Sequence, residues 1–189
     1  MKQFENDITN SLVALRKGGI ILYPTDTIWG LGCDATNPDA IQKIYRLKKR
    51  EEKKSMIIAL ATYDDIKNYV SHPSKKIIDF ISEQKNPTTA IFKNAINLPS
   101  QLINEDGSIA IRLIRDNFCE TLIKEFGKPL ISTSANVSGE PHPKNFKEIN
   151  SIIKNGVDYI VQHRQNEIEI HAPSSIIKLN SDGEIEKIR

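Results

Sequence analysis

The sequence predicts one α/β domain with a twisted, mixed sheet and flanking helices. Short apolar runs alternate with amphipathic helical segments along the chain, which is the pattern of an α/β protein. Asp182-Gly183 joins the last two apolar runs as a hairpin turn does, so part of the sheet is expected to be antiparallel. The length of 189 residues suits one domain, which we expect to span 1–189.

In the first half of the chain, helices are expected where apolar residues recur at helical spacing, and strands where short apolar runs occur. Gly18-Gly19 ends the first helix, Pro24 ends the first strand, and Asn37-Pro38 starts the second helix. The expected elements, in chain order, are helix 4–17, strand 20–23, a turn-rich loop over 25–32, helix 38–48, strand 56–60, helix 64–70, helix 75–83 and strand 89–92.

The second half of the chain continues the same alternation. Gly127 closes a helix that begins at Phe118, and the apolar run after it predicts a short strand that leads into a loop of small residues. The expected elements are strand 108–113, helix 118–126, strand 129–132, helix 145–154 and strands 157–161, 174–179 and 184–188.

The bulk composition excludes several classes of protein. With 26 basic and 24 acidic residues the net charge is only +2, so any anion site must come from local clustering. Cys33 and Cys119 lie far apart and in no ligand pattern, which indicates neither a disulfide framework nor a zinc site. There is no apolar signal region and no apolar run long enough to cross a bilayer, so we expect a cytoplasmic protein without membrane association.

The first candidate for chemistry is a run of basic residues, Lys48-Lys49-Arg50 with Lys53 and Lys54. It comes directly before a buried strand, and strand ends are where α/β proteins place ligands. Arginine offers a planar fork and lysine a point charge for phosphate, so the cluster would suit a triphosphate. Acidic residues interrupt the run, and a solvated charged face is the commoner interpretation of such a pattern.

Two further polar segments follow buried strands. Ser132-Thr133-Ser134-Ala135-Asn136 offers hydroxyl and backbone donors to phosphate or carboxylate oxygens, although a turn with a helix cap explains the same residues equally well. The segment from Tyr23 to Thr27, followed by Gly30 and Gly32, is either a polar pocket or a simple turn. The chain has no dinucleotide fingerprint and no P-loop motif.

Single residues add to these candidates. Arg112 ends an apolar run, and an arginine on a buried strand usually has an anionic partner, either an internal carboxylate or a ligand. The four histidines are not at metal-ligand spacing, so no built-in metal site is expected, and His142 lies just after the small-residue loop. Asp26 and Asp34 are candidates for a general base or for holding magnesium, although solvated loop carboxylates are commoner.

Taken together, these segments resemble the YrdC family of threonylcarbamoyl-AMP synthases. The resemblance rests on an ordered set of short motifs that spans nearly the whole chain. Lys-x-Arg at 48–50 and Ser-x-Asn at 134–136 are together the hallmark of the family. The other motifs are Gly18-Gly19, Tyr23–Thr27, Gly30–Asp34, Ile111-Arg112, Lys128-Pro129, Ser138-Gly139 and Pro173–Ile177.

The resemblance implies a fold and a reaction. The family fold is a twisted, mixed sheet around a large, concave, positively charged cavity. Its members are nucleotidyltransferases that condense L-threonine, bicarbonate and ATP into threonylcarbamoyl-AMP and pyrophosphate. A partner complex then transfers the threonylcarbamoyl group to adenosine 37 of tRNAs that read codons starting with A. Magnesium is expected to arrive bound to ATP.

The resemblance also assigns residues to roles. Threonine-binding residues are expected to be Thr27, Arg112, Ser132 and Ser174. ATP-binding residues are expected to be Arg50, Lys54, Ser108, Ser134, His142 and Arg189. Catalytic residues are expected to be Lys48, Arg50, Ser134 and Asn136. Fixed cations and donors of this kind stabilise the charge that develops when a carbamate attacks the α-phosphorus, so catalysis is expected to rest on positioning and electrostatics.

The chain departs from the family pattern at a few positions. Lys85-Asn86-Pro87-Thr88-Thr89 keeps only the last proline and the threonine of the usual Pro-Gly-Pro-x-Thr stretch. Ala59 stands where some members have a histidine near the threonine, and His142 where others have serine. The extra C-terminal domain of longer members is missing, so the single-domain form is expected.

Two other functions are consistent with parts of the pattern. One is a module that binds double-stranded RNA or tRNA without catalysis, although the balanced charge counts against strong binding of phosphates. The other is a carbamoyl-transfer domain like those of hydrogenase-maturation proteins, which lie in much longer chains with zinc-finger and acylphosphatase-like parts. Pyrophosphate release that depends on threonine and bicarbonate distinguishes the synthase from the binding module.

Overall fold

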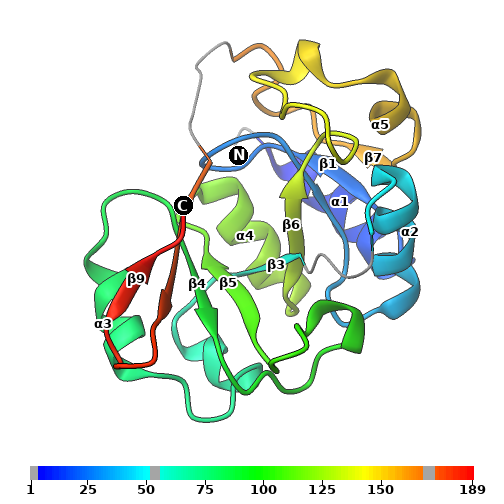
Figure 1. Ribbon diagram of the computed structural model, residues 1–189. Helices are drawn as coiled ribbons and strands as arrows, with labels where there is room; N and C mark the ends of the chain where they lie inside the picture. The colour runs from blue at the N-terminus through cyan, green and yellow to red at the C-terminus, as the bar shows by residue number, and fades with distance from the viewer. Residues whose placement is uncertain (1–3, 52–55, 168–172) are drawn as a thin grey trace.

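The computed structural model of the protein describes residues 4–51, 56–167 and 173–189, whose strands form one nine-stranded sheet. The strand order is β7-β1-β2-β6-β3-β5-β4-β8-β9 (Figure 1). The bounds are β1 Ile21–Tyr23, β2 Gly30–Gly32, β3 Ile57–Leu60, β4 Thr88–Phe92, β5 Ile109–Leu113, β6 Leu130–Ser134, β7 Tyr159–Ile160, β8 Ser175–Leu179 and β9 Ile185–Lys187. The pairs β1–β7, β3–β5 and β4–β8 are parallel and the others antiparallel, which confirms the mixed sheet.

Four of the helices lie where the apolar spacing predicted them: α1 Glu5–Arg16, α2 Pro38–Lys48, α3 Lys75–Glu83 and α4 Asn117–Phe126. The structure also has the short helix α5 Ser151–Asn155 and the 3₁₀ turns η1 Asp64–Asn68, η2 Ser100–Leu102 and η3 Phe146–Glu148. The helix expected over 64–70 is only the turn η1. The bounds of α2 match the prediction because its ends carry strong signals. The Asn37 side chain accepts the N–H groups of Asp39 and Ala40, and Lys49 adopts a left-handed conformation with φ 49°.

The core lies on both faces of the sheet. Helices α1 and α4 bury Tyr23, Ala59 and Leu130 on one face, and α2 and α3 pack with Ile58 and Ile131 on the other. Figure 1 shows β8 and β9 at the edge of the sheet beside α3, and β7 beside α5. Helices α1 and α4 leave part of this face of the sheet uncovered. In the uncovered part, polar side chains of β5 and β6 line a cavity.

The strand register brings four side chains of this uncovered part into one row. Ser132 pairs with Ile57, Ala110 pairs with Ile91, and the parallel pairing of β3 with β5 places Ile57 beside Ala110. Successive residues of a strand point to opposite faces, so these four side chains share a face. We call Ser132, Ile57, Ala110 and Ile91 the cavity floor, because all four line the cavity described below.

The expected loop over 25–32 is wrong for its last three residues. Gly30–Gly32 form the strand β2, which pairs with β1 on one side and with β6 on the other. A Cβ on Gly32 would lie 2.7 Å from Cε1 of the buried Tyr23 ring and 3.2 Å from the Ile131 carbonyl oxygen. The glycines therefore permit close packing within a strand rather than a turn.

Two predicted boundaries also differ. β6 continues to Ser134 rather than ending at Ser132, because Thr133 and Ser134 pair with β2. The helix expected over 145–154 is split into η3 and α5. The side chains of Asn145 and Asn150 each accept backbone N–H groups and start a separate short helix.

Trp29 anchors the long connection after β6. Its indole is buried, and its ring centroid lies 4.9 Å from that of Phe146 in η3. The Trp29 carbonyl also accepts the Ala135 N–H at 3.0 Å. The contacts of Trp29 with Ala135 and Phe146 hold the chain before and after residues 140–142, which border the cavity. Within the described part of the chain, no helix has the length and apolar character needed to span a membrane.

Candidate functional site

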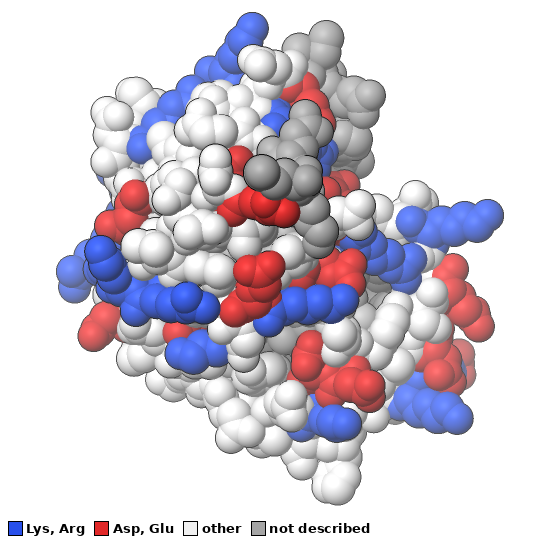
Figure 2. All heavy atoms as spheres, turned by 180° about the vertical axis from the view of Figure 1, so that it is seen from behind, with Lys and Arg blue, Asp and Glu red and all other residues white. Residues whose placement is uncertain are grey.

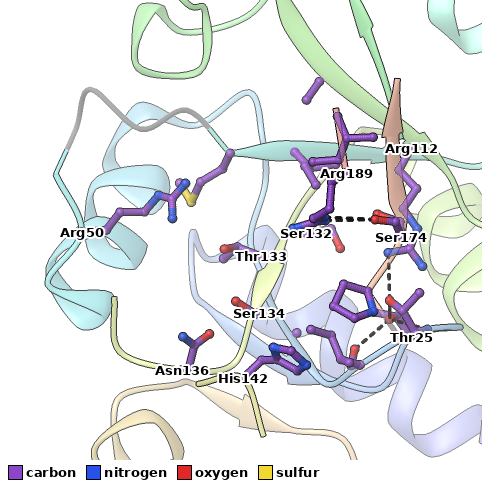
Figure 3. Close-up of a pocket in the computed structure, with 18 of the residues that line it drawn as sticks. Thr25, Arg50, Arg112, Ser132, Thr133, Ser134, Asn136, His142, Ser174 and Arg189 are labelled. Carbon is purple, nitrogen blue, oxygen red and sulfur yellow. Dashed lines mark hydrogen bonds between the residues drawn. The ribbon is translucent and has the colours of Figure 1, made fainter. Parts of the chain in front are cut away.

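A cavity of about 510 Å³ opens over the cavity floor. Its lining comes from β2, β3, β4, β5, β6 and β8 and from the connections at their ends. Figure 3 shows Arg50 across the cavity from Arg112 and Ser174, with Ser132 to Ser134 between them. The polar residues that line it are Thr25, Thr27, Arg50, Asn104, Arg112, Ser132, Thr133, Ser134, Asn136, Glu140, His142, Ser174 and Arg189. Three arginines and one glutamate among them make the lining cationic.

One end of the cavity is built around Arg112 on β5. Its guanidinium donates to the Thr27 hydroxyl at 2.9 Å through Nη1 and forms an ion pair with Asp26 through Nη2. The Arg112 side chain is only 6% exposed, and its buried Nε has no hydrogen-bond partner among the described residues. A buried donor without a partner costs free energy.

Asp26 is the internal carboxylate that pairs with the buried Arg112. It is separated from Arg112 by 86 positions and reaches it because the β1–β2 connection folds over the end of β5. Burial raises the pKa of Asp26, and the nearby Arg112 charge opposes this shift. Since its carboxylate is committed to Arg112, Asp26 is poorly placed to hold magnesium. No group of three or more potential metal ligands occurs among the described residues.

Hydroxyl groups surround this end of the cavity. Ser174 shares a hydrogen bond of 2.9 Å with Thr89, and Thr25 shares one of 3.0 Å with Thr27. The Ser174 carbonyl accepts from the Arg189 guanidinium at 3.1 and 3.3 Å, which fixes Arg189 beside the cavity. The four expected threonine-binding residues, Thr27, Arg112, Ser132 and Ser174, all line the cavity.

Lys48 lies behind the cavity rather than in its lining. Its side chain is buried, with 1% relative exposure, and its ammonium donates to the carbonyls of Ser134 and Asn136. The Lys48 carbonyl in turn accepts the Ser138 N–H at 2.7 Å. Burial, and secondarily the charge of Arg50, lowers the pKa of Lys48 to about 7. Lys48 thus holds the end of β6 and the following turn against the C-terminus of α2.

The Asn136 side chain holds the turn that follows β6. Its amide nitrogen donates to the carbonyls of Val137 at 3.0 Å and Glu140 at 2.7 Å. Its Oδ1 is buried and has no partner among the described residues. The direct stabilisation of phosphate oxygens expected of Asn136 therefore does not fit this geometry, because both of its amide hydrogens are used.

The residues expected to bind ATP lie in different places. Arg50, Ser134, His142 and Arg189 line the cavity, and Figure 3 shows His142 close to Ser134 and Asn136. Ser108 is buried and does not line it; its hydroxyl accepts instead from the amide nitrogen of Asn104, which does. Lys54 lies outside the described residues. Sequence reasoning missed Asn104, because a polar residue in a turn before a strand carries no distinguishing signal.

Comparisons with known proteins agree with this architecture. The family model Sua5_yciO_yrdC, described as "Telomere recombination", matches residues 13–189. A protein of Pseudoalteromonas translucida is 33% identical over 160 residues, which are 83% of this chain and 86% of that protein. A protein of Coxiella burnetii is 29% identical over 186 residues, 95% of this chain and 100% of that protein. Both are named threonylcarbamoyl-AMP synthase.

Solved structures show the same fold. P. abyssi Sua5, crystallised with L-threonine, superposes with a TM-score of 0.88 at 21% identity over 98% of this chain. The chain spans 54% of the length of that Sua5 protein. E. coli YciO has a TM-score of 0.82 at 22% identity, over 97% of this chain and 88% of its own length. With the family model matched over nearly its whole length, the chain belongs to the Sua5/YciO/YrdC family.

Proposed function

We propose that this protein is an L-threonylcarbamoyladenylate synthase, a nucleotidyltransferase that makes threonylcarbamoyl-AMP for tRNA modification. The observation that carries the proposal is the cavity lining at Arg112, where a guanidinium is combined with the hydroxyl groups of Thr27 and Ser174. An amino acid with a carboxylate and a small hydroxyl side chain is complementary to these groups. Relatives of this chain are named threonylcarbamoyl-AMP synthase, and P. abyssi Sua5 was crystallised with L-threonine.

The chemistry would proceed in two bond-forming steps. The threonine amine, once deprotonated, takes up the carbon of bicarbonate with loss of water, giving a carbamate. A carbamate oxygen then attacks the α-phosphorus of ATP, the bond to the β-phosphate bridging oxygen breaks, and pyrophosphate leaves. Arg112 would hold the amino acid carboxylate, while Arg50 and the Ser134 hydroxyl would face the phosphates from the other side (Figure 3).

The other residues expected at the site would complete this arrangement. Ser132 and Ser174 would contact threonine beside Thr27, and Arg189 and His142 would contact ATP. Magnesium would enter with the triphosphate. The product would be passed to a tRNA-modifying transfer complex in the cytoplasm, with residues 1–189 acting as one domain.

The net charge of +2 and the face drawn in Figure 2 do not favour an RNA-binding module instead. Figure 2 shows lysine and arginine side chains interspersed with aspartate and glutamate on the face turned away from the view of Figure 1. Strong nonspecific binding to RNA needs many phosphate contacts from clustered cations. On the described part of this face, opposite charges lie next to each other.

Pyrophosphate release tests the proposed function. Purified protein is incubated with ATP and magnesium, and threonine and bicarbonate are omitted in turn. We expect release only when both are present, and mass spectrometry should detect threonylcarbamoyl-AMP. Protein that binds RNA at moderate salt but releases no pyrophosphate under any of these conditions would rule out the synthase.

A further inference from the structure

The cavity floor divides the site into a polar and an apolar part. Around Arg112 the lining is hydroxyl-rich, whereas the floor beyond it presents Ile57, Ala110 and Ile91, with Met56 beside them. Three of these side chains lie in adjacent strands and form a flat apolar surface. Such a surface has the dimensions and chemistry to pack against the face of a planar base.

The distance along β5 separates the two parts. Arg112 and Ser108 are four residues apart on an extended chain, which corresponds to about 14 Å. The proposed product carries threonine at one end and a nucleobase at the other, joined through the carbamoyl phosphate and the ribose. With the amino acid at Arg112, the base would lie toward the Ser108 end of the floor. Asn104 lines the cavity there.

The orientation of the Asn104 side chain is fixed by Ser108. Its amide nitrogen donates to the Ser108 hydroxyl at 3.0 Å and to the Ser108 carbonyl at 3.2 Å. The backbone repeats the connection, since the Asn104 N–H donates to the Ser108 carbonyl at 2.9 Å. Asp106 accepts the Ser108 N–H at 3.1 Å and closes the turn. With both amide hydrogens directed at Ser108, the oxygen Oδ1 is the atom of Asn104 that is available to a ligand.

We propose that Asn104 is a specificity-determining residue that selects adenine over guanine, and that Ser108 is the positioning residue that keeps its oxygen toward the cavity. This inference rests on the proposed function. The exocyclic amine of adenine is a donor and complements Oδ1. Guanine carries an acceptor oxygen at the same ring position, which would face Oδ1 as a second acceptor. A rotated amide would suit guanine but would lose its bond to the Ser108 carbonyl and turn its oxygen toward that acceptor.

Nucleotide discrimination tests the inference. The ratio of kcat/KM for ATP to that for GTP is measured in pyrophosphate release, for the unaltered chain and for Asn104→Ala and Ser108→Ala. We expect the ratio to fall by at least about tenfold in Asn104→Ala and by less in Ser108→Ala, with the KM for threonine unchanged. Glu105→Gln, an exposed change in the same turn, serves as the control and should keep the original ratio.

A binding experiment separates this inference from the proposed function. Calorimetry with ATP and GTP measures the same preference whether or not the protein makes threonylcarbamoyl-AMP. A folded Asn104→Ala protein with an unchanged ATP-to-GTP ratio would overturn the role of Asn104, even where synthesis is confirmed. Loss of preference in binding by a protein without synthase activity would instead support Asn104 and reject the proposed reaction.

Discussion

Lys48 and Arg50 are two positions apart, yet the structure uses them differently. Arg50 lines the cavity, while the Lys48 ammonium is turned inward to the Ser134 and Asn136 carbonyls. The pattern Lys-x-Arg identified both as functional, but the sequence did not distinguish a ligand contact from a support beneath it. That distinction depends on where β6 lies, and β6 is more than 80 residues away in the chain.

Two substitutions test the phosphate-binding side of the cavity. We expect Arg50→Ala and Ser134→Ala each to lower turnover by at least about tenfold, because each removes a group that would stabilise charge on the phosphates. Far-UV circular dichroism should show an intact fold. Arg46→Ala, an exposed arginine on α2, is the matched control and should retain activity. Unchanged kinetics in both site variants would show that the phosphates do not bind on this side of the cavity.

Lys48 should make stability depend on pH. Its pKa is lowered to about 7 in the folded protein, against 10.5 as the ordinary value. Between these values the unfolded chain binds a proton that the folded chain has released, so this group's contribution to stability rises with pH. The difference in unfolding free energy between the unaltered protein and Lys48→Met should therefore grow from about pH 7 upward.

Urea denaturation across this pH range measures the effect. Lys49→Met is the matched control, because Lys49 is exposed and adjacent to Lys48. The difference between the unaltered protein and this control should stay constant with pH. If the difference in unfolding free energy between the unaltered protein and Lys48→Met is equally constant, the pKa of Lys48 is not lowered by burial in the folded protein.

At the scale of elements, the sequence predicted those whose signals are local. The bounds of α2 follow from Asn37, Pro38 and the residues at its end, and α4 closes at Gly127 in the left-handed region with φ 73°. β2 was missed because a strand of two glycines and a leucine has no alternating pattern. Its pairing is decided by β1 and β6, which flank it, and by the ring of Tyr23.

Gly32→Ala should destabilise the protein through the Tyr23 ring. The new methyl group would lie 2.7 Å from Cε1 of a side chain with no exposed surface. Overpacking of this kind costs about 1–3 kcal/mol, which thermal and chemical unfolding both detect. In a double-mutant cycle, Tyr23→Leu should reduce the cost of the alanine, because the colliding ring is removed. Strictly additive effects would show that Tyr23 is not the cause.

At the scale of the molecule, the sheet order creates the site. Residues from the β1–β2 connection, β5, β6 and β8 meet because β6 and β3 join two groups of strands that are far apart in sequence. The motifs predicted most of the lining, including Arg112 and Ser174. They did not predict the Asp26–Arg112 pair or the part played by Asn104, since both depend on distances across the fold rather than on spacing along the chain.

Ligands should stabilise the whole molecule through these convergent elements. A ligand present at 100 times its Kd adds about 2.7 kcal/mol to the free energy of unfolding, so ATP and threonine should each raise the Tm. Arg112→Lys should abolish the shift with threonine and keep the shift with ATP, because only the planar fork of arginine fits a carboxylate and two existing partners. Differential scanning fluorimetry measures both shifts. If threonine still raises the Tm of Arg112→Lys, the amino acid does not bind at Arg112.

The packing of Trp29 on Phe146 has a practical consequence. Trp29 is the one tryptophan of the chain, so ultraviolet excitation near its absorption edge reports on a single, known position. That position adjoins the connection that carries His142 past the cavity. The native protein therefore contains a single intrinsic fluorophore next to this connection. Stopped-flow fluorescence can use it to follow nucleotide binding without an attached dye.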